Sequence, residues 1–408
     1  MNNNIYGFIQ LPWWGYIVIA LVFTHITIMS VTLFLHRCQA HRSVIFHPVL
    51  AHFFRFWLWL TTGMVTREWV AVHRKHHAFS ERPGDPHSPM IFGLHKVLWG
   101  GVFLYKKAAE DPKVLKKYGH NTPSDWLENH LYTPYNSLGV VFMLVINLVC
   151  FGIVGLAVWL VQMVWIPFFA AGVINGLGHY FGYRNFQCDD ASTNLIPFGI
   201  LIGGEELHNN HHAYGSSAKF SVQWWEFDIG WFYIKLLSLL GLATVRKRLP
   251  KVLLSAEKSK NEASKETLIA VFNHRFLILN DYYKKVFLAI YKQEIKPVLK
   301  VKPKRLKLLK RDNYYLDHCD RYGGEKKLIQ LLLNSNDNLK IAYEFKLKLQ
   351  ELWNQNNKTQ HQLIQELQRW CQQAESESAP QVLHQFSRYL RRYRVIAYAA
   401  SHGVLSTG

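Results

Sequence analysis

Histidines at helical spacing are the residues of this sequence best suited to chemistry. The stretch HRKHH places His73, His76 and His77 together, and HNNHH repeats the same spacing later in the chain. Residues i, i+3 and i+4 share one face of an α-helix, so each box presents three imidazoles to one side. Imidazole is a good ligand for iron, copper, nickel and zinc. The two boxes therefore predict a shared metal site.

Two further stretches extend this histidine set. HRCQAH contributes a pair, and NGLGH places a lone histidine one helical turn after Asn175. One ion takes about four to six ligands, so a set of this size indicates two metal ions. His87, in DPHSP, is a candidate neighbour of the site rather than a ligand. The candidate ligands are His36, His41, His73, His76, His77, His179, His208, His211 and His212.

Long uncharged runs lie between the histidine boxes and predict membrane helices. Residues 13–35 contain no Lys, Arg, Asp or Glu, and a helix needs roughly 20 residues to cross the hydrocarbon core. The apolar stretch 137–183 predicts a helical hairpin, broken near Gln162 and Pro167. The run 49–65 is shorter and contains Arg55. Because both of its ends must stay beside histidine boxes, we expect an interfacial or re-entrant helix.

Basic residues predict the orientation in the membrane. The first residues, MNNNIYGFIQ, carry no positive charge and lack the basic region of a signal peptide, so we expect a retained segment. By the positive-inside rule the histidine side is cytoplasmic. We expect three spans in the cytoplasmic (inner) membrane, with the C-terminus in the cytoplasm. The residues that crowd the far end of the first run are Arg37, Arg42, Arg67, Arg74 and Lys75.

Composition divides the chain near residue 250. The 408 residues carry a net charge of +19, and the apolar runs fall in 1–250, whereas 251–408 is rich in Lys, Arg, Gln and Leu. The expected fold class is an all-α integral membrane protein, a transmembrane helical bundle with a cytoplasmic histidine-box cap. A basic helical cytoplasmic tail of unknown role, with amphipathic helices, is expected to follow. Nucleic acid is not an expected partner, because no recognition motif accompanies the basic residues.

The order HxxxxH, HxxHH and HxxHH, with hydrophobic hairpins between the boxes, resembles the membrane fatty acyl desaturases. The likeness is to the stearoyl-CoA-desaturase-like branch, including bacterial members with long tails. It extends over about residues 13–248 and includes EWVAVHRKHHAFSERPGDPHSP and EELHNNHHAYGSSAKFS. The resemblance implies a di-iron centre held by all nine histidines, a water-mediated metal contact from Asn175, and no catalytic residue separate from the metals. That family usually begins with a helical hairpin, so one helix fewer is expected before His36.

The implied reaction is O2-dependent desaturation of a saturated acyl chain to give a cis double bond, with acyl-CoA favoured as the substrate. Chains on a carrier protein or a phospholipid are alternatives, as is hydroxylation by an alkane- or sterol-type enzyme. A non-enzymatic zinc protein is disfavoured, because nine ligands exceed a closed zinc site. The sequence has no GxGxxG after a strand and no haem or iron–sulfur cysteine set. An external reductase with a ferredoxin-, flavin- or cytochrome-type carrier is therefore expected.

Carboxylates are expected to support the ligands from behind. A metal-binding imidazole usually donates its second ring N–H to a carboxylate or a carbonyl, which fixes its orientation. The candidates for this supporting role are Glu68, Asp85, Glu205, Glu206 and Asp228.

Overall fold

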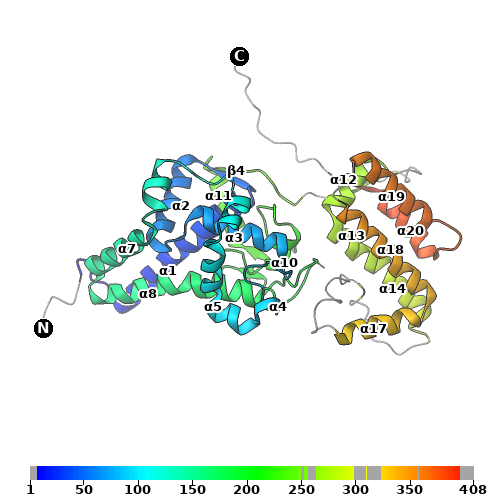
Figure 1. Ribbon diagram of the computed structural model, residues 1–408, viewed down its shortest axis with the longest axis horizontal. Coiled ribbons are helices and arrows are strands. Elements are labelled where there is room, and N and C mark those ends of the chain that lie inside the picture. The colour runs from blue at the N-terminus through cyan, green and yellow to red at the C-terminus, as the bar shows by residue number, and fades with distance from the viewer. Residues whose placement is uncertain are drawn as a thin grey trace, which may run out of the picture. The chain divides into compact units, whose positions relative to one another are not determined.

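The computed structural model describes residues 7–186, 188–249, 252–255, 263–297, 309, 323–355 and 358–395. The chain divides into two units. The first comprises Met1–Asn185 with Asp190–Leu249, and the second comprises Phe186–Asp189 with Pro250–Gly408. Both are mostly helical (Figure 1).

Two helices of the first unit are long and apolar enough to cross a membrane, among the residues described. α1 (Trp13–Met29) continues without a break into the π-helical segment η2 (Ser30–Ala40), giving 28 residues. α8 (Ile153–Ile166) continues through η4 (Pro167–Ile174) and α9 (Asn175–Leu177), giving 25 residues. The switch to π-helix follows Pro167 in the second case, since proline removes a backbone donor from the α-helical pattern.

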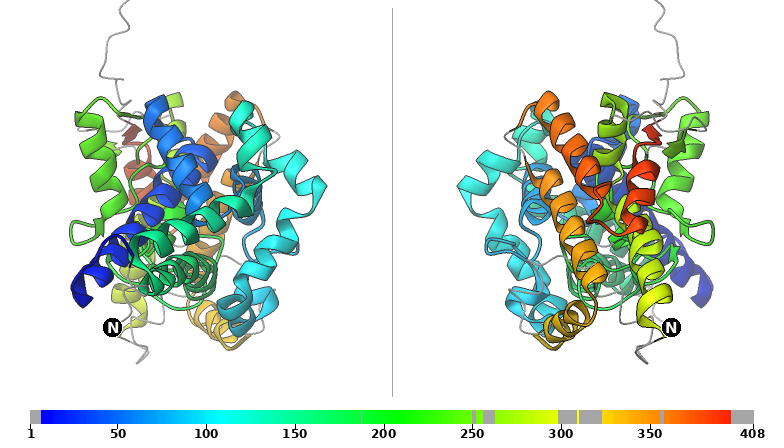
Figure 2. Two further views of the ribbon diagram at one scale, coloured as in Figure 1. Left: turned by 90° about the vertical axis from the view of Figure 1, so that its left-hand side faces the viewer. Right: turned by 90° about the vertical axis from the view of Figure 1, so that its right-hand side faces the viewer.

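α7 (Asn136–Phe151) and α8 form the predicted hairpin, beside α1 (Figures 1 and 2). The break lies at Gly152, however, and not near Gln162 and Pro167 as the sequence suggested. Gly152 has φ of 64°, a left-handed conformation that glycine adopts without steric cost. An ideal Cβ on Gly155 would lie 2.0 Å from the carbonyl oxygen of Asn147, so the two backbones approach closely just after the turn.

The run 49–65 contains one helix, α2 (Pro48–Thr61), which packs against α7. An ideal Cβ on Gly139 of α7 would lie 2.3 Å from the carbonyl oxygen of Trp59. The guanidinium of Arg55 pairs with Asp125 at 2.5 Å and with Glu128 at 2.9 Å. These carboxylates explain how a charged residue is accommodated in this apolar run.

Shorter helices and strand pairs complete the first unit. α5 (Leu94–Ala109) packs on η4 through facing glycines, since an ideal Cβ on Gly172 would lie 2.3 Å from the carbonyl oxygen of Leu98. β1 (Val44–Phe46) pairs antiparallel with β4 (Ala243–Val245), and β2 (Phe198–Gly199) pairs parallel with β3 (Phe227–Asp228). The other helices are α3 (Thr66–Phe79), α4 (Pro89–Phe92), α5 (Leu94–Ala109), α6 (Pro112–Tyr118), η3 (Glu128–Tyr132), α10 (His208–Ala213) and α11 (Ile229–Leu239).

The second unit is helical and has a hydrophobic core of its own. Phe287, Leu349, Trp370 and Phe386 are among its buried side chains. β5 (Val252–Leu254) pairs antiparallel with β6 (Tyr393–Val395). Of the basic helical tail predicted over 251–408, residues 251, 256–262, 298–308, 310–322, 356–357 and 396–408 lie outside the described residues. The helices are α12 (Lys265–Asn273), α13 (Arg275–Tyr282), η5 (Tyr283–Phe287), α14 (Leu288–Ile290), η6 (Tyr291–Ile295), α17 (Gly323–Asn334), α18 (Asp337–Asn354), α19 (Gln360–Ala374) and α20 (Gln381–Leu390).

Candidate metal centre

The nine predicted histidines lie together in the first unit as two groups. Within each group, one ring nitrogen from every histidine lies within 4.8 Å of the others, so each group could hold a metal ion. The larger group is His36, His41, His73, His77 and His211. The smaller group is His76, His179, His208 and His212.

Helical spacing explains how each HxxHH box serves both groups. His73 and His77 are four residues apart on α3 and enter the larger group, whereas His76 points to the smaller one. α10 does the reverse: His208 and His212 enter the smaller group, and the remaining histidine of the box enters the larger. Residues i and i+4 lie one above the other, while i+3 lies on the other side of that row. Each box therefore divides its imidazoles between two neighbouring sites.

The remaining ligand candidates come from the ends of the two long helices. His36 lies within η2, and His41 immediately follows it. His179 follows α9 at the end of the other long helix. π-Helical turns are rare and often occur at functional sites, because they rotate side chains out of the α-helical pattern. Both long apolar helices thus deliver a histidine to the site through a π-helical segment.

Within both groups the Nε2 atoms face one another at short distances. In the larger group, His36 Nε2 lies 3.0 Å from His211 Nε2, and His41 Nε2 lies 2.8 Å from His73 Nε2. In the smaller group, His76 Nε2 and His208 Nε2 lie 3.1 and 2.9 Å from His179 Nε2. Facing lone pairs of neutral imidazoles repel one another, and a shared cation removes that repulsion. The donor set therefore fits metal ions.

Carboxylates hold the opposite ring nitrogens. His36 Nδ1 donates to Glu205 at 2.6 Å, and His76 Nδ1 donates to Asp85 at 3.0 Å. His212 Nδ1 donates to Asp190 at 2.9 Å, and the carboxylate of Glu81 lies 2.6 Å from His179 Nδ1. An ionised carboxylate only accepts hydrogen bonds, so it fixes the proton on Nδ1 and leaves the Nε2 lone pair free for a metal.

The structure thus changes the predicted set of supporting carboxylates. Asp85 and Glu205 contact imidazoles, but Glu206 accepts the backbone N–H groups of the 202–204 turn at 2.9 and 3.1 Å. Asp228 instead binds the buried guanidinium of Arg37 at 2.8 and 3.0 Å, which neutralises a charge that water cannot reach. Glu68 lies in the wall of a cavity beside the site.

Two further carboxylates beside the imidazoles, Glu81 and Asp190, were not predicted from the sequence. Glu81 lies four residues after the first HxxHH box, in the turn that follows α3. That spacing was a usable signal, since a residue just beyond a ligand helix can turn back toward the ligands. Asp190 lies 22 residues before its partner His212, in an irregular segment without a local pattern. Only the chain path brings this second pair together.

Burial favours the neutral form of six ligand candidates outside the membrane spans, whereas the pKa of His179 is raised, because the carboxylate of Glu81 outweighs the opposing effect of burial. Burial lowers the pKa of His41 to about 3, with help from the nearby positive charge of Arg74. Burial, reinforced by neighbouring histidines, also holds the pKa values of His73 and His77 well below the ordinary 6.5. The same holds for the three histidines of α10. Neutral imidazole is the form that binds metal.

Two other predicted residues lie beside the groups. The His87 ring is buried, with its centroid 4.4 Å from that of His76, and it forms a third cluster with His76 and Asp85. Asn175 begins α9, one helical turn before His179, and lines the same cavity as His208. Its contact with a metal through water stays a prediction.

A cavity of about 520 Å³ adjoins both histidine groups. His36 and His73 of the larger group and His208 of the smaller one line it. Its wall is formed mainly by apolar side chains from both long helices, α3 and α5, including Ile28, Val31, Val72, Ile166 and Ile174. Its charged lining residues other than Glu205 and the histidines are Glu68, Lys106 and Glu110.

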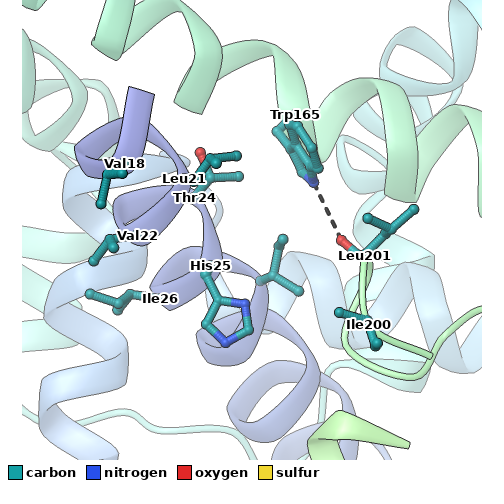
Figure 3. A pocket seen from close by; sticks show the side chains of 10 residues that line it. Val18, Leu21, Val22, Thr24, His25, Ile26, Trp165, Ile200 and Leu201 are labelled. Atoms are coloured by element: carbon teal, nitrogen blue, oxygen red, sulfur yellow. Dashed lines mark hydrogen bonds between the residues drawn. The ribbon is translucent and has the colours of Figure 1, made fainter. Parts of the chain in front are cut away.

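A second pocket, of about 420 Å³, lies elsewhere, between α1, α8 and residues 200–201 (Figure 3). Its lining is mainly apolar, shares Ile28 with the first cavity and contains none of the nine histidines. Trp165 closes one side by donating from Nε1 to the carbonyl oxygen of Leu201 at 3.4 Å. His25, which also lines it, has Nε2 3.0 Å from the hydroxyl of Tyr233. This pocket is therefore separate from the metal centre.

The fold and the site define a helical protein with two membrane-length apolar helices and a histidine-rich site suited to metal ions, and comparisons identify its family. Residues 11–235 match the family model described as fatty acid desaturase. The chain is 31% identical over 235 residues to the sn-1 stearoyl-lipid 9-desaturase of Anabaena variabilis, covering 57% of this chain and 84% of that protein. It is 34% identical over 218 residues to the protein of the same name from Synechocystis, covering 53% and 66%. It is 32% identical over 228 residues to an acyl-CoA 5-desaturase of Anemone leveillei, covering 53% and 67%.

The chain therefore belongs to the fatty acid desaturase family. It is an acyl-lipid or acyl-CoA desaturase, an oxidoreductase. Its relatives include proteins named for lipid-bound chains and others named for coenzyme A thioesters.

Residues 242–408 match a second family model, described as transposase. The C-terminal region is thus a transposase-family domain, which corrects its description as a plain tail. The groups of three or more His, Cys, Asp or Glu that could hold a metal all lie in the first unit, as far as the described residues extend.

Proposed function

We propose that this chain introduces a cis double bond into a saturated acyl chain at a di-iron centre. One observation carries the proposal: two facing histidine groups adjoin a cavity whose wall is mainly apolar. A saturated chain offers no polar handle, so a site that binds it must select by shape and apolar contact. One iron would be held by His36, His41, His73, His77 and His211. The other would be held by His76, His179, His208 and His212, with Asn175 contacting it through water.

Iron bound there supplies the coupling of O2 reduction to hydrogen removal from neighbouring methylenes. The chain's own residues position the reactants. Asp85 and Glu205 orient imidazoles through Nδ1, and the apolar wall holds the acyl chain and excludes water from it. No catalytic residue separate from the metal ligands is needed for these roles. The electrons come from an external reductase with a ferredoxin-, flavin- or cytochrome-type carrier.

The same reasoning supports the expected membrane arrangement. α1 with η2, α7, and α8 through α9 are the three spans, and α2 is interfacial or re-entrant. α7 has 16 residues, short of a full crossing by itself. It lies against the longer α8 in an antiparallel hairpin, which supports a paired crossing. The histidine side faces the cytoplasm, because the basic residues follow the first span.

For the acyl carrier we favour an ester of a membrane lipid over the coenzyme A thioester that the sequence suggested. Two of the relatives, from Anabaena and Synechocystis, are named as acting on stearoyl-lipid. Near Tyr105 the cavity is lined by two carboxylates, Glu68 and Glu110, and one ammonium group, Lys106. Excess negative charge disfavours the several phosphate charges of coenzyme A.

The test is a lipid profile in a host without desaturases that is supplied with a reductase. The intact chain is compared with a His76→Ala, His77→Ala double variant, and the fatty acids are identified by mass spectrometry. Monounsaturated chains that appear only with the intact protein support the proposal. Hydroxylated chains would instead assign it to the hydroxylase alternative. Absence of both product and bound iron would exclude the di-iron proposal.

The carrier is tested separately with purified protein in vesicles. Isotopically labelled stearoyl lipid and labelled stearoyl-CoA are offered in parallel with the same electron donor. Label in the unsaturated lipid, at early times and without added coenzyme A, supports the lipid ester. Faster labelling from stearoyl-CoA would return the choice to the thioester.

We further propose that residues 250–408 form a module that is not needed for desaturation. The second unit has its own hydrophobic core, and the metal-binding groups found among the described residues lie in the first. A chain ending at Leu249 should keep its desaturase activity within about twofold per folded molecule, because the site residues all precede that point. Loss of activity in a folded, iron-loaded truncation would contradict this separation.

DNA binding is a second candidate function, confined to this module. The transposase match favours it, as does the charge of residues 250–408, which contain 28 Lys and Arg against 15 Asp and Glu. This proposal differs from the expectation in the sequence analysis, where the lack of a recognition motif argued against nucleic acid as a partner. Gel-shift titrations of the full chain and the truncation at graded salt would decide it, since phosphate contacts weaken steeply with salt. Equal, weak binding by both chains would remove the candidate.

A further inference from the structure

Tyr105 places a buried hydroxyl in the wall of the acyl cavity. It lies on α5 between Val102 and Ala109, at positions that share one helical face, and all three residues line the cavity. The hydroxyl oxygen is buried and has no hydrogen-bond partner within the described part of the chain. Buried hydroxyls in native proteins nearly always have a partner. A polar group of the bound substrate is therefore the natural candidate.

The charged residues near Tyr105 mark the mouth of the cavity. Lys106 and Glu110 follow it at the end of α5 and are exposed, whereas Glu68 on α3 is only partly buried. Burial raises the pKa of Tyr105, and the nearby charge of Glu68 raises it further. The phenol therefore stays protonated and is available as a donor. This end of the cavity suits the polar end of an acyl ester.

The position of Tyr105 along α5 also indicates how far an acyl chain held there would extend into the cavity. α5 touches α9 at Leu98, whose backbone nitrogen would lie 3.6 Å from an ideal Cβ on Gly176. Tyr105 is two helical turns further on, about 10 Å along the axis at 1.5 Å per residue. An extended backbone advances about 1.1–1.2 Å per bond, so this distance corresponds to roughly nine carbon–carbon bonds. A carbonyl at Tyr105 would thus leave about the tenth carbon at the level of α9, beside Asn175.

We propose that Tyr105 is a positioning residue, whose hydroxyl donates a hydrogen bond to the carbonyl oxygen of the bound acyl group. This contact sets which methylenes lie beside the metal centre and so determines the position of the new double bond. The inference rests on the proposed desaturase function and deepens it by naming the substrate group that is recognised. Lipid esters and thioesters both present this carbonyl, so the assignment holds for either carrier.

The first test is Tyr105→Phe, which removes only the hydroxyl oxygen. One lost neutral hydrogen bond should raise KM about 3- to 10-fold with little change in kcat. The double bond should also spread to neighbouring positions, as identified by mass spectrometry of derivatised products. Tyr118→Phe, on α6 and outside the cavity lining, is the matched control and should leave KM and position unchanged. Iron content should equal that of the parent in both variants.

A second measurement does not depend on turnover. A stearoyl ester with a 13C-labelled carbonyl is bound to the protein, and its carbonyl stretch is recorded by infrared difference spectroscopy. A hydrogen-bonded carbonyl absorbs at lower frequency, so the band should move upward in Tyr105→Phe and stay in place in Tyr118→Phe. An unchanged band would overturn the assignment, as would unchanged KM with the same single double-bond position. If the parent protein binds the ester with a shifted band but makes no unsaturated product, the proposed function is refuted, whereas the hydrogen bond from Tyr105 to the carbonyl is supported.

Discussion

Replacing Glu205 with glutamine tests whether a carboxylate behind an imidazole strengthens the metal site. One oxygen of Glu205 accepts from His36 Nδ1 at 2.6 Å and from the Thr32 hydroxyl at 2.7 Å. A glutamine oxygen can accept both bonds, so the substitution removes the charge while keeping the shape. Supporting groups of this kind contribute about 10- to 100-fold to metal affinity. Because the hydrogen bonds survive, we expect the lower end, about 10-fold or roughly 1.4 kcal/mol.

The assay is iron retention. Purified protein is loaded with ferrous iron and dialysed against graded chelator, and the iron per chain is measured by mass spectrometry. Glu205→Gln should lose one iron at about tenfold less chelator than the parent, because His36 belongs to only one of the two groups. The second iron should be retained nearly as in the parent, since Asp85, Glu81 and Asp190 still support its ligands.

Glu206→Gln is the matched control for this measurement. Glu206 is the next residue and is also buried, but it binds backbone N–H groups and no imidazole. It should change iron retention by less than about twofold, although it can lower overall stability. Equal losses in the two variants would refute the argument, because a general effect of the turn would then explain both. Unchanged retention in Glu205→Gln would refute it as well.

Three further predictions concern stability. Asp228→Ala leaves the buried guanidinium of Arg37 without its carboxylate and should cost about 3–5 kcal/mol. Asp125→Asn alters a pair whose carboxylate is half exposed and leaves Arg55 paired with Glu128, so it should cost less than about 1 kcal/mol. Thermal unfolding in detergent compares the two variants, and similar melting temperatures would contradict the first value. Gly155→Val places side-chain atoms on the backbone of α7 and should separate the hairpin, reducing the monodisperse fraction in size-exclusion chromatography. The pKa of His41 is about 3 in the folded chain and 6.5 in the unfolded chain, so the unfolded chain binds more protons between these pH values. The free energy of unfolding of the metal-free protein should therefore fall by about 2 kcal/mol from this group by pH 5. A melting temperature that stays the same between pH 7 and pH 5 would contradict this prediction.

Sequence spacing by itself located the histidines, for a local reason. The offsets i, i+3 and i+4 determine which side chains share a helical face, whatever the rest of the fold does. His73, His76 and His77 could therefore be identified as one box, and the long uncharged runs as membrane helices, from the order of residues alone. The absence of redox-cofactor motifs likewise required only the sequence. Their common feature is that each depends on residues close together in the chain.

Tertiary structure decided the features that depend on distant residues. Each HxxHH box divides between two metal groups because α3 and α10 face each other across the site, and spacing by itself leaves that partition open. Asp190 reaches His212 only because of the path of an irregular segment. Asp228 pairs with Arg37, a buried charged residue that lies far from it in the sequence. The hairpin turns at Gly152 because close backbone packing, invisible in composition, favours a left-handed glycine there. Local periodicity is encoded in adjacent residues, but partners and cavities are set by packing between elements that the chain connects at a distance.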